Sequence, residues 1–460
     1  MKRYENLLRR IYELNSRQTV KMGLSKMKML HSAMNAPSEQ FQVIHVAGTN
    51  GKGSVCLKVA ETLRRAGYKT GLFTSPHLFT YRERARVNNE MISVNQVTDI
   101  LERILYVSEN ELDIVPSFFE ITTMMALEHF SRSNVDVVVL ETGLGGRLDC
   151  TNIVERPVLT GITNIGFDHV NVLGHTMEEI AREKAGIAKE NVDMVLGPNM
   201  NAIAEEVIRD HASRCGSKII DTSRCEISSC VEYDKENIDM AHTMLRVLQE
   251  SKGFSKLRDC NVTRGLKRLP WCRFEITKLN DVDIVVDAAH NEMGMRALMR
   301  GLRNRYPSRT SCMMRFDSIT RSRRVYMIRQ MTTPFLSRNT GTFRFVIGLS
   351  EDKERSTMMK EIDADVVSGL HFTKSSHRRA TQVRDLIKDV PSSLRQYVQA
   401  AKGSVSVEQT ILDAAQRAVL NRDVVVVCGS LYMMGEVSNV LENLEWSEVS
   451  DNVVKKGASL

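Results

Sequence analysis

Long hydrophobic segments and organised cysteines are both missing from this sequence of 460 residues. The longest apolar runs, VDVVVLETG and RDVVVVCGS, fall far short of the roughly 20 residues that a membrane-spanning helix needs. The nine cysteines form no CxxC pair and no zinc-ligand spacing, so we expect reduced thiols and neither a zinc site nor a disulfide framework. Aromatic residues make up only 6%, and no nucleic-acid-binding module accompanies the net charge of +7. We therefore expect a soluble, cytoplasmic protein without membrane or nucleic-acid partners, whose positive charge suits a polyanionic small molecule.

The amino-terminal residues 1–24 also lack the pattern of a signal peptide, because acidic residues are mixed with the basic ones. Their apolar residues recur at helical spacing, so this stretch is expected to form a first helix. A mitochondrial presequence is the alternative interpretation.

Repeats are absent, and the chain instead alternates short apolar runs with amphipathic stretches. In the first part, these runs are FQVIHVA, KTGLFTS, VDVVVLE, RPVLTGITNI and VDMVLG. After about residue 270, the pattern starts again with VDIVVDAA, FRFVIGLS, DADVVSGLHFT and RDVVVVCGS. Such alternation is typical of parallel sheets with crossover helices, so it predicts an α/β protein with two domains.

The segment RLPWCRFEI separates the two halves and contains one of only nine prolines. We expect a first domain over residues 1–268, a linker at 269–273 and a second domain over 274–460. Residues 305–340 are rich in Arg, Ser and Thr and allow no assignment of elements, whereas the final SDNVVKKGASL is typical of a frayed terminus.

The stretch VIHVAGTNGKGSV joins an apolar strand to a helix through a glycine-rich loop. Such loops cradle phosphates, because backbone N–H groups and the helix dipole attract the anion, Lys52 adds a cation and a serine hydroxyl can ligate Mg²⁺. The spacing departs from the common motif, since Val46 stands where a glycine is usual and Gly53 separates Lys52 from Ser54. A glycine turn with a solvated lysine is the alternative, but the coincidence of strand, glycines, lysine and serine favours a phosphate loop.

Polar residues also follow other expected strands. Glu141 ends VDVVVLE and precedes three glycines, which is where nucleotide enzymes hold Mg²⁺ but also where a simple turn occurs. Asp168 and His169 follow ITNI and could join a carboxylate on a cation, although His169 alone is more typical of a hydrogen-bonded loop histidine. Ser75 follows KTGLFT, where a hydroxyl can reach a metal or cap a helix.

In the second half, Asp287, His290 and Asn291 lie between a strand and a helix. This is the crevice position of an open α/β sheet, and it is also where Asp and Asn cap helices.

Together these segments resemble the folylpolyglutamate synthase and dihydrofolate synthase family, within the Mur ligase superfamily, from about residue 20 to about residue 440. HVAGTNGKGSV and LETGLGGRLDCTNIV match the family's signature stretches. TSPHL, FFEITT, TNIGFDH, REKAGIAKE, DAAHN and CGSLYMMGEV occur in the family's order. The resemblance implies an amino-terminal P-loop ATPase-type domain with a parallel-rich sheet and a smaller Rossmann-like carboxyl-terminal domain.

The resemblance also implies roles for individual residues. It places the triphosphate of ATP at Thr49, Asn50, Gly51, Lys52, Gly53 and Ser54, and it makes Ser75, Glu141 and His169 ligands of Mg²⁺. Lys184, in the family's KxGI context, is implied to be carbamylated, so Lys52, Lys184 and His169 are the implied catalytic residues. Arg273 and Asp287 match contacts to ATP from the second domain, and Asn237 resembles a nucleotide-contacting asparagine.

The activity implied by the resemblance is ATP-dependent ligation of L-glutamate to a folate-type carboxylate through an acyl phosphate, with release of ADP and phosphate. Dihydropteroate as acceptor gives dihydrofolate, whereas a reduced folate gains a further glutamate. The forms GTNGKGS and ETGLGGRLD favour a bifunctional enzyme that performs both reactions. The implied cofactors are ATP and Mg²⁺, and a monomer is the default expectation.

Three departures from the family concern the second half. Cys272 stands where a glycine is usual, Glu292 stands where a proline is usual, and residues 305–340 fit poorly. Alternatives that stay open are an enzyme with only one of the two activities, a Mur ligase acting on a cell-wall nucleotide precursor, and a P-loop kinase or switch NTPase. The last leaves TSPHL and the second α/β domain unexplained.

Overall fold

The computed structural model describes residues 2–17, 23–229, 231–279, 281–307, 341–351, 353–399 and 406–443. Most of the 305–340 segment and the whole of the final SDNVVKKGASL lie outside these residues. The chain divides into two compact units, the first formed by Met1–Ser229 and Tyr233–Pro270, the second by Cys230–Glu232 and Trp271–Leu460. The break between Pro270 and Trp271 lies inside the stretch that the sequence marks as a linker.

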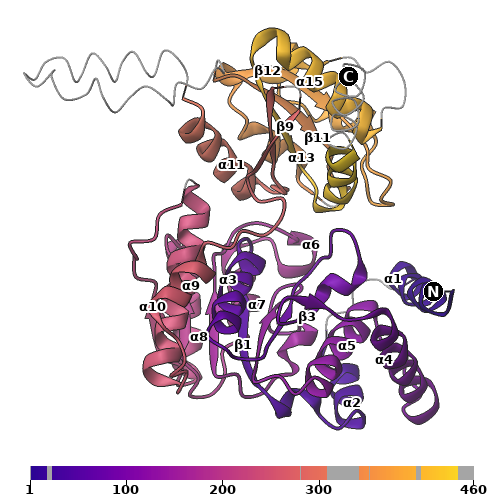
Figure 1. Cartoon of the computed structure of the whole chain (residues 1–460), viewed down its shortest axis with the longest axis vertical. Helices are drawn as coiled ribbons and strands as arrows, with labels where there is room; N and C mark the ends of the chain where they lie inside the picture. The colour runs from indigo at the N-terminus through magenta and orange to yellow at the C-terminus, as the bar shows by residue number, and fades with distance from the viewer. Residues whose placement is uncertain are drawn as a thin grey trace, which may run out of the picture. The chain divides into compact units, whose positions relative to one another are not determined.

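The first unit contains an eight-stranded sheet with helices on both faces (Figure 1). Its strands are β1 Gln42–Ala47, β2 Thr70–Phe73, β3 Ala85–Val87, β4 Glu90–Met91, β5 Val137–Glu141, β6 Leu159–Ile162, β7 Met194–Leu196 and β8 Ile219–Asp221. Its helices are α1 Lys2–Arg17, α2 Ser25–Ala33, α3 Lys52–Arg65, α4 Val94–Tyr106, α5 Phe118–Arg132, α6 Val170–Leu173, α7 Met177–Ala185, α8 Ala202–Arg214, α9 Glu232–Ser251 and α10 Asp259–Leu266.

The strand order of this sheet is β4-β3-β2-β5-β1-β6-β7-β8. From β2 to β8 all neighbours are parallel, and only β3 and β4 add antiparallel pairs at one edge. β1 therefore lies inside the sheet, between β5 and β6. A doubly wound sheet of this kind gathers the carboxyl ends of its parallel strands at one edge, which is where such proteins bind ligands.

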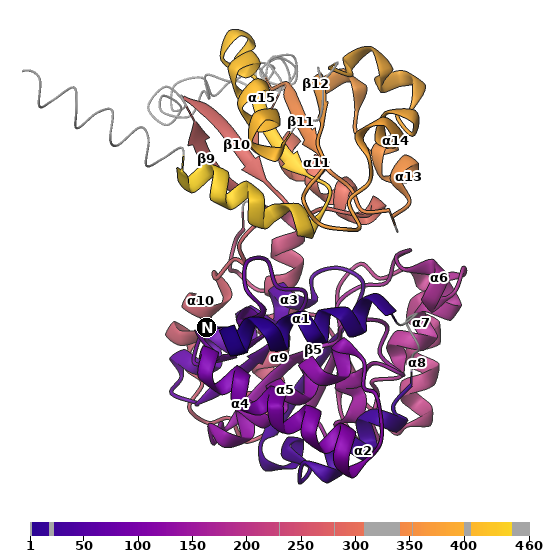
Figure 2. The same cartoon turned by 90° about the vertical axis from the view of Figure 1, so that its right-hand side faces the viewer.

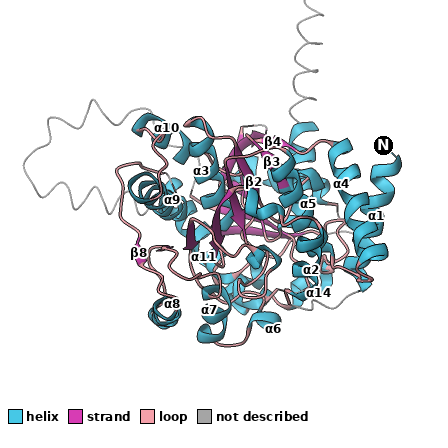
Figure 3. Cartoon of the chain, turned by 90° about the horizontal axis from the view of Figure 1, so that it is seen from below, coloured by secondary structure: helices cyan, strands magenta, loops and turns pink. Residues whose placement is uncertain are grey.

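Alternation along the strands divides the core of the first unit between the two faces of the sheet. Ile44 and Val46 pack toward α3 and α9, in one cluster of buried residues. Val43 packs in the opposite direction, with residues of α4 and α5, and Ala47 packs with α7 and α8. Figure 3 shows α3, α9 and α10 on one side of the sheet and α4 and α5 on the other, whereas Figure 2 shows α1 beside α4 and α5. This three-layer arrangement explains why the central strands are apolar on both faces.

The second unit has a five-stranded sheet in the order β12-β11-β13-β10-β9, in which only β9 is antiparallel. Its strands are β9 Glu275–Leu279, β10 Val282–Val286, β11 Phe343–Ile347, β12 Val367–Phe372 and β13 Val424–Cys428. Its helices are α11 Glu292–Arg305, α13 Arg355–Lys360, α14 Val383–Lys388 and α15 Val407–Asn421, and residues 431–443 are also helical.

The predicted α/β class is confirmed, and all nine apolar runs named from the sequence contain a strand of one of the two sheets. The sequence did not predict β3, β4, β8 or β9. Three of these have only two or three residues, too few for a recognisable alternation. Within the described parts of the chain, no helix is both long and apolar enough to span a membrane.

Candidate functional site

The glycine-rich loop follows β1 and leads directly into α3, whose first residue is Lys52. The connection after β6 holds its backbone in place. The amide of Thr49 donates to the carbonyl of Asn164 over 2.8 Å, and the amide of Asn50 donates to the Asn164 side chain over 2.9 Å. Thr163 donates its hydroxyl proton to the Asn50 carbonyl over 2.6 Å. The loop is thereby fixed to the end of β6 before any ligand binds.

Two positions of this loop require glycine, because neighbouring side chains lie where a Cβ atom would be. Gly48 has φ +145°, and a Cβ there would lie 1.8 Å from Oγ1 of Thr163. Gly51 has φ +84°, and a Cβ there would lie 2.4 Å from Oδ1 of Asn237 on α9. Both backbone conformations favour glycine. The structure thus brings Asn237 against the loop, although 186 residues of sequence separate it from Gly51.

Gly53 accounts for the unusual spacing of the motif. A Cβ at this position would lie 3.3 Å from Oε2 of Glu141, so the first turn of α3 passes directly over that carboxylate. Glu141 is the last residue of β5 and is only 5% exposed. Its Oε2 also accepts a hydrogen bond from the backbone amide of Ser75 over 2.9 Å. Ser75, Glu141 and the start of α3 therefore lie close together. Gly53 permits this approach because it has no side chain.

Two lysines face the carbonyl oxygens of the same loop. Nζ of Lys52 donates to the carbonyls of Gly48 and Thr49 over 3.1 and 3.2 Å. Nζ of Lys184, on α7, donates to the carbonyl of Gly48 over 2.9 Å. Burial, helped by the nearby positive charge of Lys52 and opposed by Asp168 and Asp149, lowers the pKa of Lys184 to about 7. Lys184 is therefore a buried amine that is partly neutral at neutral pH.

His169 lies in the connection after β6, in the left-handed region with φ +52°. Its side chain is 40% exposed, and its backbone amide donates to Oδ1 of Asp168 over 2.9 Å. His169 and Asp168 thus share the connection that also supplies Thr163 and Asn164. Across the part of the chain that the structure describes, no three His, Cys, Asp or Glu side chains cluster closely enough to hold a metal by themselves. A cation at this edge would accordingly need ligands of other types, such as the hydroxyl of Ser75.

In the second unit, a tight turn over residues 272–274 folds around Asp287. Cys272 and Phe274 both have positive φ, +59° and +49°. The carboxylate of Asp287 is buried and accepts hydrogen bonds from the amides of Phe274, over 2.9 Å, and Ala289, over 2.8 Å. Arg273 lies at the tip of this turn and is partly exposed. The left-handed conformation of Cys272 is one that glycine adopts more readily than other residues.

Asn291 and His290 follow Asp287, and the sequence left open whether such residues bind a ligand or cap a helix. Asn291 caps α11, because its side chain accepts a hydrogen bond from the amide of Gly294 over 2.8 Å. His290 lies beside it, with Nδ1 2.9 Å from the carbonyl oxygen of Ala288. The capping role of Asn291 is therefore confirmed.

Sequence reasoning did not single out Thr163, Asn164 or Asp149. Thr163 and Asn164 hold the glycine loop, and Asp149 holds the connection after β5 by accepting from the amides of Leu144 and Thr151 over 2.8 and 3.0 Å. Asn164 lies within TNIGFDH, whose position after a strand was the available signal. Its role depends on the contact between β1 and β6, which the linear sequence does not display.

The chain is similar to known proteins over nearly its whole length. Residues 46–253 match the Mur ligase middle domain family. The "Dihydrofolate synthase/folylpolyglutamate synthase" of Bacillus subtilis is 28% identical over 472 residues, which cover 92% of this chain and 96% of that protein. Among solved structures, the folylpolyglutamate synthase of Thermotoga maritima is 27% identical and matches with a TM-score of 0.71 over 96% of each chain.

A second solved structure is a bifunctional folylpolyglutamate synthase/dihydrofolate synthase with Mn, AMPPNP and L-glutamate bound. It is 26% identical, covers 93% of this chain and 96% of its own, and has a TM-score of 0.72. These similarities extend through both compact units and agree with the sequence motifs at residues 43–55 and 140–154. Over nearly its whole length the chain is therefore similar to the folylpolyglutamate and dihydrofolate synthases, and residues 46–253 match the Mur ligase middle domain.

Proposed function

We propose that this protein is an ATP-dependent ligase that joins L-glutamate to a folate-type carboxylate, acting as both dihydrofolate synthase and folylpolyglutamate synthase. The observation that carries this proposal is the loop after β1, where Gly53 allows the first turn of α3 to pass over the buried carboxylate of Glu141. A phosphate loop and an acidic residue at adjacent strand ends are the parts that phosphoryl transfer requires. The similarity over more than nine-tenths of a bifunctional relative supports the choice of substrates.

We assign the triphosphate of ATP to residues 49–54. The amide groups at the start of α3 face the edge of the sheet where the parallel strands end, and the helix dipole favours an anion there. Lys52 adds positive charge, and its Nζ is bonded to carbonyl oxygens, not to a carboxylate. An incoming phosphate is a stronger partner for Lys52 than the two carbonyls it contacts. Asn237, Arg273 and Asp287 are assigned to the nucleotide on the resemblance alone.

We assign Mg²⁺ to Ser75, Glu141 and His169. The residues fit a hard cation, since Glu141 supplies a buried carboxylate, the backbone of Ser75 is bonded to that carboxylate, and Mg²⁺ uses few protein ligands. When bound, the metal supplies charge neutralisation to the phosphates of ATP.

Lys184 is proposed to be carbamylated. Only a neutral amine adds CO₂, and burial lowers the pKa of Lys184 to about 7. Carbamylation would convert the buried cation into an anion close to Gly48 and thereby change the sign of the charge at the base of the loop.

In the proposed reaction, the chain positions groups and balances charge. Residues 49–54 orient the γ-phosphoryl group for transfer to the acceptor carboxylate, and Lys52 stabilises the charge that develops during transfer. The resulting acyl phosphate reacts with the amine of L-glutamate, which gives an amide and phosphate. No covalent intermediate with the protein is required.

The test of the proposed function is ADP release by the purified full chain with ATP, Mg²⁺ and L-glutamate. One reaction contains 7,8-dihydropteroate and another tetrahydrofolate. Release with both acceptors is expected, and release with only one would reduce the assignment to that single activity. Glutamate-independent ADP release would indicate a kinase or switch NTPase, and competition by a UDP-linked precursor would indicate a cell-wall ligase.

We further propose that the protein acts as a monomer in the cytoplasm, on small molecules alone. Size-exclusion chromatography with light scattering checks the monomer, for which a mass near 52.1 kDa is expected.

A further inference from the structure

Lys58 on α3 is completely buried, with 0% of its surface exposed, and the phosphate loop does not use it directly. Its ammonium group lies where α3, α9 and the end of α10 meet. Nζ is 2.9 Å from Oδ1 of Asp234, and it donates to the carbonyl oxygens of Leu266 and Arg268 over 2.7 and 2.9 Å. A lysine has three N–H donors, so this charge is fully satisfied inside the protein.

The surroundings of Lys58 are equally well ordered. The second carboxylate oxygen of Asp234 accepts the hydroxyl of Ser229 over 2.8 Å. Leu266 is the last residue of α10, so the cation lies at the negative end of that helix. α10 lies tightly against α3, because a Cβ on Gly265 would be 2.0 Å from Oγ1 of Thr62. Burial lowers the pKa of Lys58, whereas the neighbouring Asp234 opposes that change.

Each partner of Lys58 is connected to a residue that the proposed function assigns to ATP. Asp234 precedes Asn237 by three residues on α9, and Oδ1 of Asn237 contacts the phosphate loop at Gly51. Leu266 and Arg268 lead in sequence into residues 269–273, which end at Arg273. Lys58 itself lies six residues after Lys52, on the helix that begins at the loop. One ammonium group therefore connects α3 with two other segments of the first unit, each of which leads to a residue assigned to the nucleotide.

We propose that Lys58 is a positioning residue for ATP. It fixes the positions of Asn237 and of the segment before the linker relative to α3, the helix that carries Lys52. The inference rests on the proposed function, because it needs ATP to bind at residues 49–54. Lys58 is buried and does not touch the nucleotide, so its effect passes through Asp234, Leu266 and Arg268. A merely structural ion pair would lower stability without changing nucleotide affinity.

The test compares variants of the full chain by calorimetric titration with AMPPNP and Mg²⁺, by steady-state kinetics and by thermal unfolding. Lys58→Met has nearly the same length and no charge. Lys58→Gln keeps two N–H donors for the carbonyls and is also neutral. The matched control is Arg344→Met, which removes another buried cation from an ion pair, with Asp423, in the second unit.

We expect Lys58→Met to weaken AMPPNP binding about tenfold or more and to raise KM for ATP by more than it lowers kcat, because small displacements in such sites are costly. Lys58→Gln should fall between Lys58→Met and wild type. Arg344→Met should leave the Kd of AMPPNP within about twofold of wild type, although its Tm falls by roughly 10 °C or more. If Lys58→Met does not fold, Lys58→Gln carries the same comparison.

Two results would overturn the inference. In the first, wild type binds AMPPNP and folded Lys58→Met or Lys58→Gln binds it equally well. In the second, the double variant Lys58→Met/Asp234→Leu regains both the Tm and the affinity of wild type. The defect of Lys58→Met would then come from the unpaired charge of Asp234 and not from the loss of the bonds that Lys58 makes. Wild-type protein that neither binds AMPPNP nor releases ADP would reject the proposed function itself, and the inference with it.

Discussion

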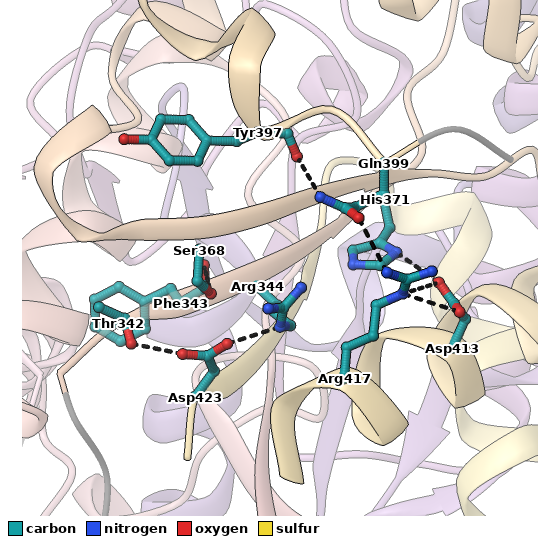
Figure 4. Close-up of polar contacts among 10 residues, drawn as sticks. All are labelled: Thr342, Phe343, Arg344, Ser368, His371, Tyr397, Gln399, Asp413, Arg417 and Asp423. Carbon is teal, nitrogen blue, oxygen red and sulfur yellow. Dashed lines mark hydrogen bonds and ion pairs between the residues drawn. The ribbon is translucent and has the colours of Figure 1, made fainter. Parts of the chain in front are cut away.

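Two regions of this protein contain buried or partly buried cations, and these cations have different partners in the two regions. In the first unit, Lys52 and Lys184 converge on carbonyl oxygens of the loop after β1, and neither forms an ion pair within the described residues. In the second unit, Arg344 on β11 lies 2.7 Å from Asp423, which also accepts the hydroxyl of Thr342 over 2.6 Å. Figure 4 shows this pair between the strands.

A second group of paired polar side chains, formed by Asp413, Arg417 and His371, belongs to the same unit. Asp413 on α15 lies between Arg417, at 3.1 Å, and Nδ1 of His371, at 3.2 Å (Figure 4). Burial lowers the pKa of His371 to about 4, so this imidazole is neutral at neutral pH. The second unit thus neutralises its buried Arg344 with its own carboxylate, whereas the loop region leaves the positive charge of Lys52 for an anion from outside. We therefore expect Lys52 to meet an anionic ligand and the pair of Arg344 with Asp423 to stabilise the fold.

The largest expected effect is that of Lys52→Ala, which removes the cation at the start of α3. ADP release with ATP, Mg²⁺, L-glutamate and either acceptor should fall by a factor of at least about 10³, because this charge is expected to act on the transferred phosphoryl group. Tm should change little, since Lys52 contacts only loop carbonyls.

The control for this experiment is Lys69→Ala, which changes an exposed lysine just before β2 and should keep full activity. A Lys52→Ala variant with wild-type turnover would remove the loop from the assigned site.

The next effect is on stability. Arg344→Met leaves Asp423 buried without a cation, which should lower the free energy of unfolding by about 3–5 kcal/mol. Urea denaturation checks this value, and activity below the unfolding transition should be unchanged.

The double variant Arg344→Met/Asp423→Leu replaces the pair by apolar side chains and should recover most of the loss, since such replacements are often neutral. A loss of activity in folded Arg344→Met would contradict the structural role given to this pair.

Lys184→Met should have opposite effects on stability and activity. The folded-state pKa of Lys184, about 7, lies below the ordinary value of 10.5, so the charged form is disfavoured by folding. The resulting penalty is complete below about pH 7 and disappears as the pH rises to 10.5. Removing the amine should therefore raise the free energy of unfolding by roughly 2–4 kcal/mol at pH 6.5, and by almost nothing near pH 10.5.

The same variant should lose ligase activity, because no carbamate can form. Thermal unfolding at both pH values, together with ADP release, tests both expectations. A lower Tm at pH 6.5 would show that the hydrogen bond to Gly48 outweighs the cost of burying the charge.

The smallest effect concerns the modification of Lys184 itself. The neutral fraction of a lysine with pKa about 7 rises steeply between pH 6 and 8. At fixed CO₂ pressure, a carbamate signal from ¹³C-labelled CO₂ should grow over this range in NMR spectra of the wild type. Lys184→Met is the blank, and equal signals in both proteins would exclude carbamylation at this position.

Much of the fold could be predicted from the sequence because the relevant signals are local. The nine apolar runs and the glycine loop each show their pattern within a dozen residues. The short strands β3, β4 and β8 do not, because strands of two or three residues form through their neighbours in the sheet. The sequence does not predict the antiparallel β9 either, since RFEI gives no separate strand signal beside Trp271 and Pro270.

The candidate site likewise contains residues that the sequence predicts and contacts that it does not. Lys52, Glu141 and Ser75 could be named from motifs, and the structure brings them to one edge of the sheet. The hydrogen bonds of Asn164 to the loop, and the three bonds of Lys58, join residues more than 100 positions apart. No local pattern encodes such contacts, because they follow from the order of strands and the packing of helices.

The sequence by itself determined the alternation of strands and helices, the phosphate loop and the order of the motifs, because each depends on residues that are neighbours in the chain. Only the tertiary structure decided how buried charges are used. It placed Lys184 away from water and so lowered its pKa, joined Lys58 to three acceptors and paired Arg344 with Asp423. The physical reason is that desolvation and ion pairing depend on what surrounds a charge in space, and that environment exists only after the chain has folded.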